Sequence, residues 1–281
     1  MKVYKDYDQQ QLNNQYNMRQ HVADYAAYFS RWETLSRQTE KEHPIVKNIY
    51  YGIETEERLD IFPAKKSFSR TIVFIHGGYW HLLDKSMFYF LAGHFLQYDI
   101  TTVLINYPLA PFASIDTIVS SCKRAFSWLH QHIGQYNGDP SALYALGHSA
   151  GGHLAAMLLA DGNHHYLKGM ISLSGLFRLE PLMYTYLNEV LHMNLAIALR
   201  NSPVLLEPLH DCPVLLYAGT DETNEFKSQS SELYDAWKSK NKNIKMLSVN
   251  GKNHYSIVDA VVEPESSLNS IILHMMDISV D

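Results

Sequence analysis

The chain has 281 residues, of which 46% are hydrophobic and 19% are charged, and its formal net charge at pH 7 is -6. This balance supplies enough apolar residues for a large core and excludes global disorder. The acidic balance and the lack of a long basic run argue against nucleic acid or an anionic membrane as the main partner. The length suits one large α/β domain.

The cysteines and the N-terminal residues indicate the cellular compartment. The two cysteines, Cys122 and Cys212, lack metal-ligand spacing and favour a reduced, intracellular environment. The N-terminus is polar and has no apolar signal region, and no apolar segment approaches the roughly 18 residues that a membrane span needs. We therefore expect a soluble cytoplasmic protein.

Residues 1–43 are polar and rich in Gln, Asn and Tyr, and apolar side chains recur among them at helical spacing. These apolar positions are Val22, Tyr25, Ala26, Phe29 and Trp32. We expect a helical extension packed on the main domain. A lid or an oligomer contact, such as a homodimer interface, is the open alternative.

Strand patterns begin after this extension. Residues 45–51 and 58–63 alternate and are separated by a turn, which predicts an antiparallel pair. Later apolar runs are rich in β-branched residues, as is typical of strands buried on both faces. They are residues 71–76, 100–105, the run into Gly147, and residues 170–174, 214–218 and 244–249.

Helical patterns alternate with these strands at residues 115–132, 226–237 and 257–275. This alternation predicts an α/β fold with a mostly parallel sheet and helices on both faces. Residues 177–209 break the rhythm and contain no clean strand, so we expect a small helical cap over the site. The predicted organisation is one domain, residues 1–281, that includes the extension and the cap.

A sharp turn between a strand and a helix carries the candidate nucleophile. The sequence Gly147-His148-Ser149-Ala150-Gly151 ends an apolar run and leads directly into an apolar helical stretch. A serine on such a strained turn needs neighbours without Cβ atoms. Ser149 is therefore the predicted nucleophile, although a glycine-rich helix start alone would give the same pattern.

A serine that attacks a carbonyl creates an oxyanion, which fixed hydrogen-bond donors must stabilise. The loop His76-Gly77-Gly78-Tyr79-Trp80 follows a buried strand and can supply backbone N–H groups. The donors from this loop are either Gly77 and Gly78 or Gly78 and Tyr79, and Ala150 supplies another.

The candidate acid and base follow later strands. Asp221 is favoured over Glu222 as the acid because it lies closer to its strand end. His254 is the histidine that follows both nucleophile and acid and lies on a loop after the last strand. The order Ser149, Asp221, His254 matches the Ser-Asp-His order of α/β-hydrolases. The sequence contains no metal-binding, phosphate-loop or dinucleotide motif, so we expect no metal and no cofactor.

These motifs resemble the α/β-hydrolase fold, and most closely the kynurenine formamidase (arylformamidase) branch near the hormone-sensitive-lipase-like esterases. The residues that carry the resemblance are His76–Trp80, Gly147–Gly152, Asp221, His254, the Tyr-rich N-terminal helix, Tyr51-Gly52, Leu59–Phe62, and Asn106–Pro111, which is similar to an esterase Y-R-L-A-P segment. The resemblance implies a Ser149–Asp221–His254 triad and an oxyanion hole in the His76–Trp80 loop. Tyr79 replaces the third glycine of the lipase-type loop, which narrows the pocket beside it.

Formamidases of this branch cleave N-formyl aromatic amines. That chemistry would suit contacts from Tyr79, Trp80, Tyr184 and Tyr186, whose alternative role is core packing or, for a tyrosine, a hydrogen-bonded position at the surface. A short-chain carboxylesterase acting on another small molecule is the competing expectation. A catalytically inactive binding module on the same fold is a remote third.

Overall fold

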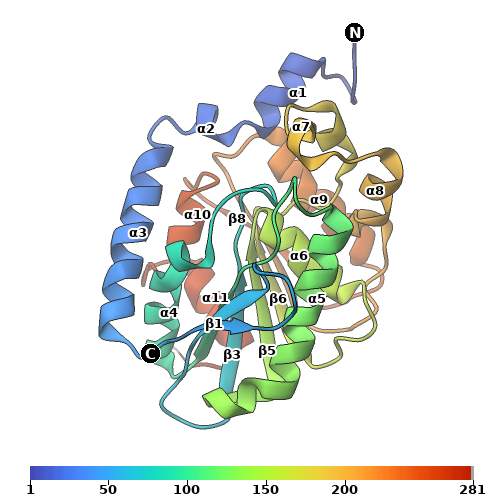
Figure 1. The fold of residues 1–281 in the computed structure, drawn as a ribbon. Coiled ribbons are helices and arrows are strands. Elements are labelled where there is room, and N and C mark those ends of the chain that lie inside the picture. Colours follow the sequence, from blue (N-terminus) through green and yellow to red (C-terminus); the bar gives the residue numbers. More distant parts are fainter. Residues whose placement is uncertain (280–281) are drawn as a thin grey trace.

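The apolar runs form an eight-stranded sheet in the computed structural model of the chain, which describes residues 1–279 (Figure 1). The strand order is β1-β2-β4-β3-β5-β6-β7-β8, in which β2 is antiparallel to both neighbours and the other pairs are parallel. The strands are β1 (Val46–Tyr50), β2 (Arg58–Phe62), β3 (Ser69–Ile75), β4 (Thr101–Ile105), β5 (Gly138–His148), β6 (Leu167–Leu173), β7 (Val214–Gly219) and β8 (Ile244–Val249). The predicted fold class and the antiparallel first pair are confirmed.

Helices cover both faces of this sheet. Figure 1 shows α3, α4 and α11 on one side and α5, α6 and α9 on the other. The α-helices are α1 (Gln9–Tyr16), α2 (Met18–His21), α3 (Tyr25–Glu42), α4 (Tyr89–Phe95), α5 (Ile115–His132), α6 (Ala150–Leu159), α7 (Asn188–Leu191), α8 (Leu195–Arg200), α9 (Asn224–Trp237), α10 (Ser256–Asp259) and α11 (Ser267–Met275). Short 3-10 helices are η1 (Lys85–Phe88), η2 (Leu96–Tyr98), η3 (Ile133–Tyr136), η4 (Glu180–Tyr184) and η5 (Pro203–Leu205).

Local sequence explains where α5 begins and which side it buries. The Ser114 side chain accepts a hydrogen bond from the backbone N–H of Thr117, which caps the first turn. Ile118, Cys122 and Phe126 recur at helical spacing and are buried. The predicted helix over residues 115–132 therefore coincides with the observed one.

Two details differ from the expectation. The predicted final helix is divided into α10 and α11, and Pro264 lies in the segment between them. Proline lacks the N–H that a helix interior needs and disfavours helical conformation in the preceding residue. Helix α4 was not predicted, because six of its seven residues are buried and the sequence shows no amphipathic periodicity there.

The N-terminal segment and the 177–209 segment both contribute to one end of the molecule, where α1 and α2 lie near α7, whereas α3 runs along the side and packs against α4 (Figure 1). The first contains α1 to α3 and the second contains η4, α7, α8 and η5. Trp32 of α3 is buried and donates its indole N–H to Asp259 of α10 at 2.6 Å. Among residues 1–279, no helix is long and apolar enough to cross a membrane.

Candidate active site

Ser149 lies between β5 and α6 in a strained backbone conformation, with φ 55° and ψ -117°. A non-glycine residue seldom adopts a positive φ, and such strain is concentrated at functional sites. Gly151 makes the turn possible, because a Cβ there would lie 1.9 Å from the carbonyl oxygen of Ile75 on β3. The glycine spacing of the motif therefore follows from the close approach of α6 to β3.

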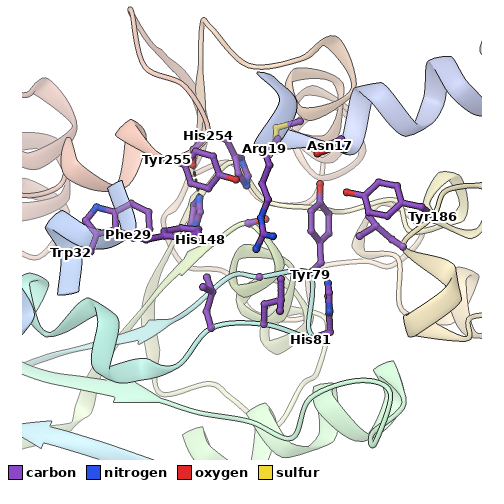
Figure 2. Close-up of a pocket in the computed structure, with 16 residues that line it drawn as sticks. Asn17, Arg19, Phe29, Trp32, Tyr79, His81, His148, Tyr186, His254 and Tyr255 are labelled. Atoms are coloured by element: carbon purple, nitrogen blue, oxygen red, sulfur yellow. Dashed lines mark hydrogen bonds between the residues drawn. The ribbon is translucent and has the colours of Figure 1, made fainter. Parts of the chain in front are cut away.

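Ser149 lines a cavity of about 290 Å³. Figure 2 shows this cavity, with His148 and His254 on one side and Tyr79 and Tyr186 on the other. The N-terminal segment forms one wall of the cavity, and the loop after β3 forms a second wall together with the Ser149 turn. The cap and the loop after β8 form the remaining walls. The lining residues are Asn17, Met18, Arg19, Phe29, Trp32, Gly78, Tyr79, His81, Leu82, Leu83, His148, Ser149, Tyr186, Leu187, His254 and Tyr255. A volume of this size suits a small substrate.

His254 lies in this cavity and is oriented by a buried carboxylate. Its Nδ1 is 3.0 Å from Oε2 of Glu222, and both side chains are almost fully buried. The other carboxylate oxygen of Glu222 accepts hydrogen bonds from the backbone N–H of Gly219 at 2.7 Å and from the hydroxyl of Ser174 at 2.5 Å. An Nδ1–H donated to Glu222 leaves the Nε2 lone pair of His254 free to accept a proton.

Ser149 and His254 line the same cavity, although among residues 1–279 their side chains form no hydrogen bond with each other. Contacts between nucleophile and base are often long in the absence of substrate and shorten in the reacting complex. The arrangement therefore places a strained serine, a histidine and a buried carboxylate at one site.

The expectation that Asp221 orients His254 was wrong. Asp221 is exposed, and its carboxylate accepts a hydrogen bond from the hydroxyl of Thr220 at 3.1 Å. A turn explains the difference, because the backbone N–H of Glu222 donates to the carbonyl of Gly219 at 3.3 Å and returns residue 222 to the end of β7. Proximity to a strand end in sequence did not identify the side chain that faces the site.

The loop after β3 passes directly beside Ser149. A Cβ at Gly77 would lie 3.0 Å from Cβ of Ser149, and Gly78 has φ +97°. Within residues 1–279, the backbone N–H groups of Gly78, Tyr79 and Ala150 donate no hydrogen bond to a backbone carbonyl of a loop or turn. These donors are therefore available to a ligand.

His148 contacts the backbone of His254. This role was not predicted from the sequence. Its Nε2 lies 2.8 Å from the backbone carbonyl oxygen of His254, and the two rings are 4.7 Å apart. Burial, and then the neighbouring His254, hold the pKa of His148 well below its usual value. A neutral His148 can donate to the His254 carbonyl without adding positive charge beside the base.

The expected aromatic contacts are divided between the cavity and the core. Tyr79 and Tyr186 line the cavity. Trp80 does not, because it is fully buried and its indole N–H donates to Nδ1 of His153 at 3.2 Å. Tyr184 is half-buried in η4 and also lies outside the lining. The prediction that Trp80 and Tyr184 contact substrate is therefore not supported.

Three further aromatic side chains line the cavity and were not predicted as site residues. Phe29 and Trp32 come from α3, and Tyr255 follows His254 (Figure 2). Tyr255 packs against Phe29 with ring centroids 5.5 Å apart. The helical spacing of Phe29 and Trp32 revealed a buried face, but the sequence did not show that this face also reaches the cavity.

Similarities to known proteins extend over most of the chain. Residues 122–270 match the prolyl oligopeptidase family, and residues 59–177 match the BD-FAE family. The chain is 30% identical to a kynurenine formamidase of Salmo salar, over 98% of this chain and 99% of that protein. It is 32% identical to a kynurenine formamidase of Danio rerio, over 86% of each. A crystal structure provisionally described as a thioesterase, from Silicibacter sp. TM1040, has a TM-score of 0.83 and 27% identity, over 93% of this chain and 98% of that one.

Proposed function

Because this chain belongs to the kynurenine formamidase family of α/β-hydrolases, we propose that it hydrolyses N-formyl aromatic amines through a covalent intermediate on Ser149. The observation that carries this proposal is the hydrogen bond between His254 and the buried Glu222, in the same cavity as Ser149. A neutral serine is a weak nucleophile and needs an oriented base.

The proposed reaction has two steps. In the first, Oγ of Ser149 attacks the formyl carbon and its proton passes to Nε2 of His254. The N–H groups of the Gly78–Tyr79 loop and of Ala150 stabilise the oxyanion. The C–N bond then breaks, and the amine leaves with the proton from His254.

In the second step, water attacks the formyl-serine ester. His254 takes a proton from this water, and the collapse of the tetrahedral intermediate releases formate and returns the proton to Ser149. Glu222 keeps its charge and stabilises the imidazolium in both steps. The reaction consumes one water and requires no cofactor.

The shape and chemistry of the cavity support an aromatic amine with a small acyl group. Phe29, Tyr255 and Tyr186 present aromatic surface around the opening, and Tyr79 narrows the floor beside Ser149. Aromatic rings prefer stacked or edge-on contacts with other rings. The volume of about 290 Å³ leaves little room for a long acyl chain beside an aromatic leaving group.

A second candidate function is the hydrolysis of a small ester or thioester. The similarity to the Silicibacter protein favours it, because that protein is provisionally described as a thioesterase. Both reactions use the same attack, oxyanion and acyl-serine steps, so the two candidates differ in the acyl and leaving groups alone.

A substrate panel tests the proposal. We expect N-formylkynurenine to be hydrolysed with kcat/KM of about 10⁴ M⁻¹s⁻¹ or more, as is typical of enzymes with their own substrates. We also expect p-nitrophenyl acetate to be cleaved faster than p-nitrophenyl butyrate, because the acyl site is small. Preferential cleavage of the butyrate ester with no formamide hydrolysis would favour the second candidate. Ser149→Ala is the control for background hydrolysis.

A further inference from the structure

Of the residues that line the cavity, Arg19 alone has a permanently charged side chain. It belongs to α2, and Figure 2 shows its side chain extending into the cavity between Tyr255 and Tyr79. No Asp or Glu lines the cavity with it. The site therefore presents a positive charge that no lining carboxylate balances.

The other arginines of the described chain all have carboxylate partners. The pairs are Arg31–Asp259, Arg37–Glu33, Arg58–Glu56, Arg70–Asp277, Arg124–Glu57, Arg178–Glu232 and Arg200–Asp116. Within residues 1–279, Arg19 has no such ion pair. Arg19 is an exposed residue that lines the cavity, and its guanidinium, without an acidic partner, is available to an anionic ligand.

Hydrogen bonds hold the backbone at Tyr16, three residues before Arg19. The backbone carbonyl of Tyr16 accepts a hydrogen bond from the Tyr79 hydroxyl at 2.6 Å and another from the Tyr186 hydroxyl at 3.5 Å. The Arg19 guanidinium lies over the Tyr25 ring, with Cζ 5.3 Å from the ring centroid. A cation held over an aromatic face loses less freedom when a ligand binds.

The charge of Arg19 lowers the pKa values of titratable side chains around the cavity. Burial, and then Arg19, lower the pKa of His81. Burial raises the pKa of Tyr255 to about 12 and also raises the pKa of Tyr186, and Arg19 opposes both increases. The guanidinium therefore contributes a positive potential across the cavity, in a protein whose net charge is -6. A local cation of this kind offsets the general repulsion of anions.

We propose that Arg19 binds a carboxylate of the substrate and makes the chain selective for N-formyl aromatic amines that carry a carboxylate group. This inference rests on the proposed function and adds the charge of the substrate to it. A guanidinium recognises a carboxylate through two parallel N–H···O hydrogen bonds, which fix orientation as well as charge. Arg19 is thus a specificity-determining residue supplied by the N-terminal segment.

A pair of substrates that differ in one group tests this role. The pair is N-formylkynurenine and its carboxamide, measured with the parent enzyme, Arg19→Gln and the control Arg37→Gln. Arg37 lies on α3 outside the cavity, and its side chain is 71% exposed. We expect the parent and the control to prefer the carboxylate by about tenfold in kcat/KM, mostly through KM, as one charge-assisted contact allows.

Arg19→Gln should lose this preference and cleave the carboxamide within about twofold of the parent rate, since a single uncharged contact changes rates little. Arg19→Lys should keep part of the preference, because the charge remains without the planar fork. A preference that survives in Arg19→Gln, or an equal loss on both substrates, would overturn the proposal.

An ester pair separates this inference from the proposed function. The pair is 4-acetoxybenzoate and 4-acetoxybenzamide, which differ in the same way and do not depend on formamide cleavage. If the parent cleaves neither formamide, the proposed function fails, and a carboxylate preference on the esters that depends on Arg19 still supports the anion site. If the formamides are cleaved and Arg19→Gln changes no carboxylate preference, the function stands and the Arg19 proposal is wrong.

Discussion

The floor and the roof of the cavity are held in place by different interactions. The floor consists of the loop after β3, the Ser149 turn and the His254 loop, and its geometry depends on close backbone packing, such as that of Gly151 against Ile75. The roof consists of the N-terminal helices and the cap. Side-chain packing holds it, including that of the fully buried Leu12, Tyr16 and Trp32, together with hydrogen bonds such as those that hydroxyls donate to the Tyr16 carbonyl. In the proposed mechanism, backbone packing fixes the reacting groups, and side chains of the layer above them select the substrate.

The largest expected effect concerns the acid in the floor. Glu222→Gln should lower kcat/KM by about 10³–10⁴-fold, because an amide cannot stabilise the imidazolium and can favour the wrong tautomer of His254. The matched control is Asp221→Asn, which removes the neighbouring exposed carboxylate and should leave the rate within about twofold, as for other surface substitutions. Steady-state kinetics on one substrate suffice. The assignment fails if Asp221→Asn is the damaging change.

The packing of the floor predicts a strong effect on stability. Gly151→Ala should reduce the free energy of unfolding by about 3 kcal/mol, because the new methyl group would overlap the Ile75 carbonyl. Gly134→Ala is the control, since a Cβ there would lie 3.8 Å from its nearest neighbour, Cγ of Pro140. Urea unfolding of both variants measures the difference. Equal stabilities would contradict a floor set by backbone approach.

His153 joins the floor to the cap and predicts how stability changes with pH. It accepts a hydrogen bond from the Trp80 indole at 3.2 Å, and its Nε2 lies 2.8 Å from the carbonyl oxygen of Asn201. Burial lowers the pKa of His153 to about 4, below the value of about 6.5 expected in the unfolded chain. The unfolded state therefore binds the proton first, and stability falls as pH decreases from about 6.5 towards 4.

The pH effect can be isolated with His153→Gln, which retains an acceptor and a donor but does not titrate. Between pH 7 and pH 4.5 the parent should lose about 2–3 kcal/mol more unfolding free energy than this variant. Urea unfolding at the two pH values gives both losses. If the two proteins lose the same amount, His153 does not carry the acid sensitivity that its burial predicts.

The smallest expected effect concerns the roof. Tyr79→Phe removes the hydroxyl that donates to the Tyr16 carbonyl at 2.6 Å. It should cost about 1 kcal/mol of stability and raise KM by roughly threefold, with kcat within about twofold, as the loss of one hydrogen bond implies. Tyr184→Phe, outside the cavity, is the control. A fall in kcat as large as that of Glu222→Gln would contradict the assignment of catalysis to the floor and of substrate selection to the roof.

The same division explains how much the sequence could predict. Ser149, the Gly77–Gly78 loop and His254 each follow a strand of a mostly parallel sheet, and strand ends meet at one edge of such a sheet. Their approximate positions therefore follow from local patterns. The choice between Asp221 and Glu222 depends on a turn after β7 that no periodicity reveals.

The roof was harder to predict because its contacts join segments that are distant in the sequence. Arg19 of α2 and Phe29 of α3 reach the cavity only through tertiary packing of the N-terminal segment, in which α3 packs against α4. Conversely, Trp80 lies within the oxyanion-loop motif but points into the core against His153. Proximity to a motif is thus weaker evidence for substrate contact than tertiary packing.

The central claim is that Ser149 forms the covalent intermediate, and active-site labelling with a serine-directed phosphonate tests it most directly. Intact and peptide mass spectrometry should show one adduct, on the peptide that contains Ser149, with activity lost in proportion to labelling. Ser149→Ala should remain unlabelled and lose at least about 10³-fold in kcat. A full adduct on another residue, or near-parental activity in Ser149→Ala, would contradict the account.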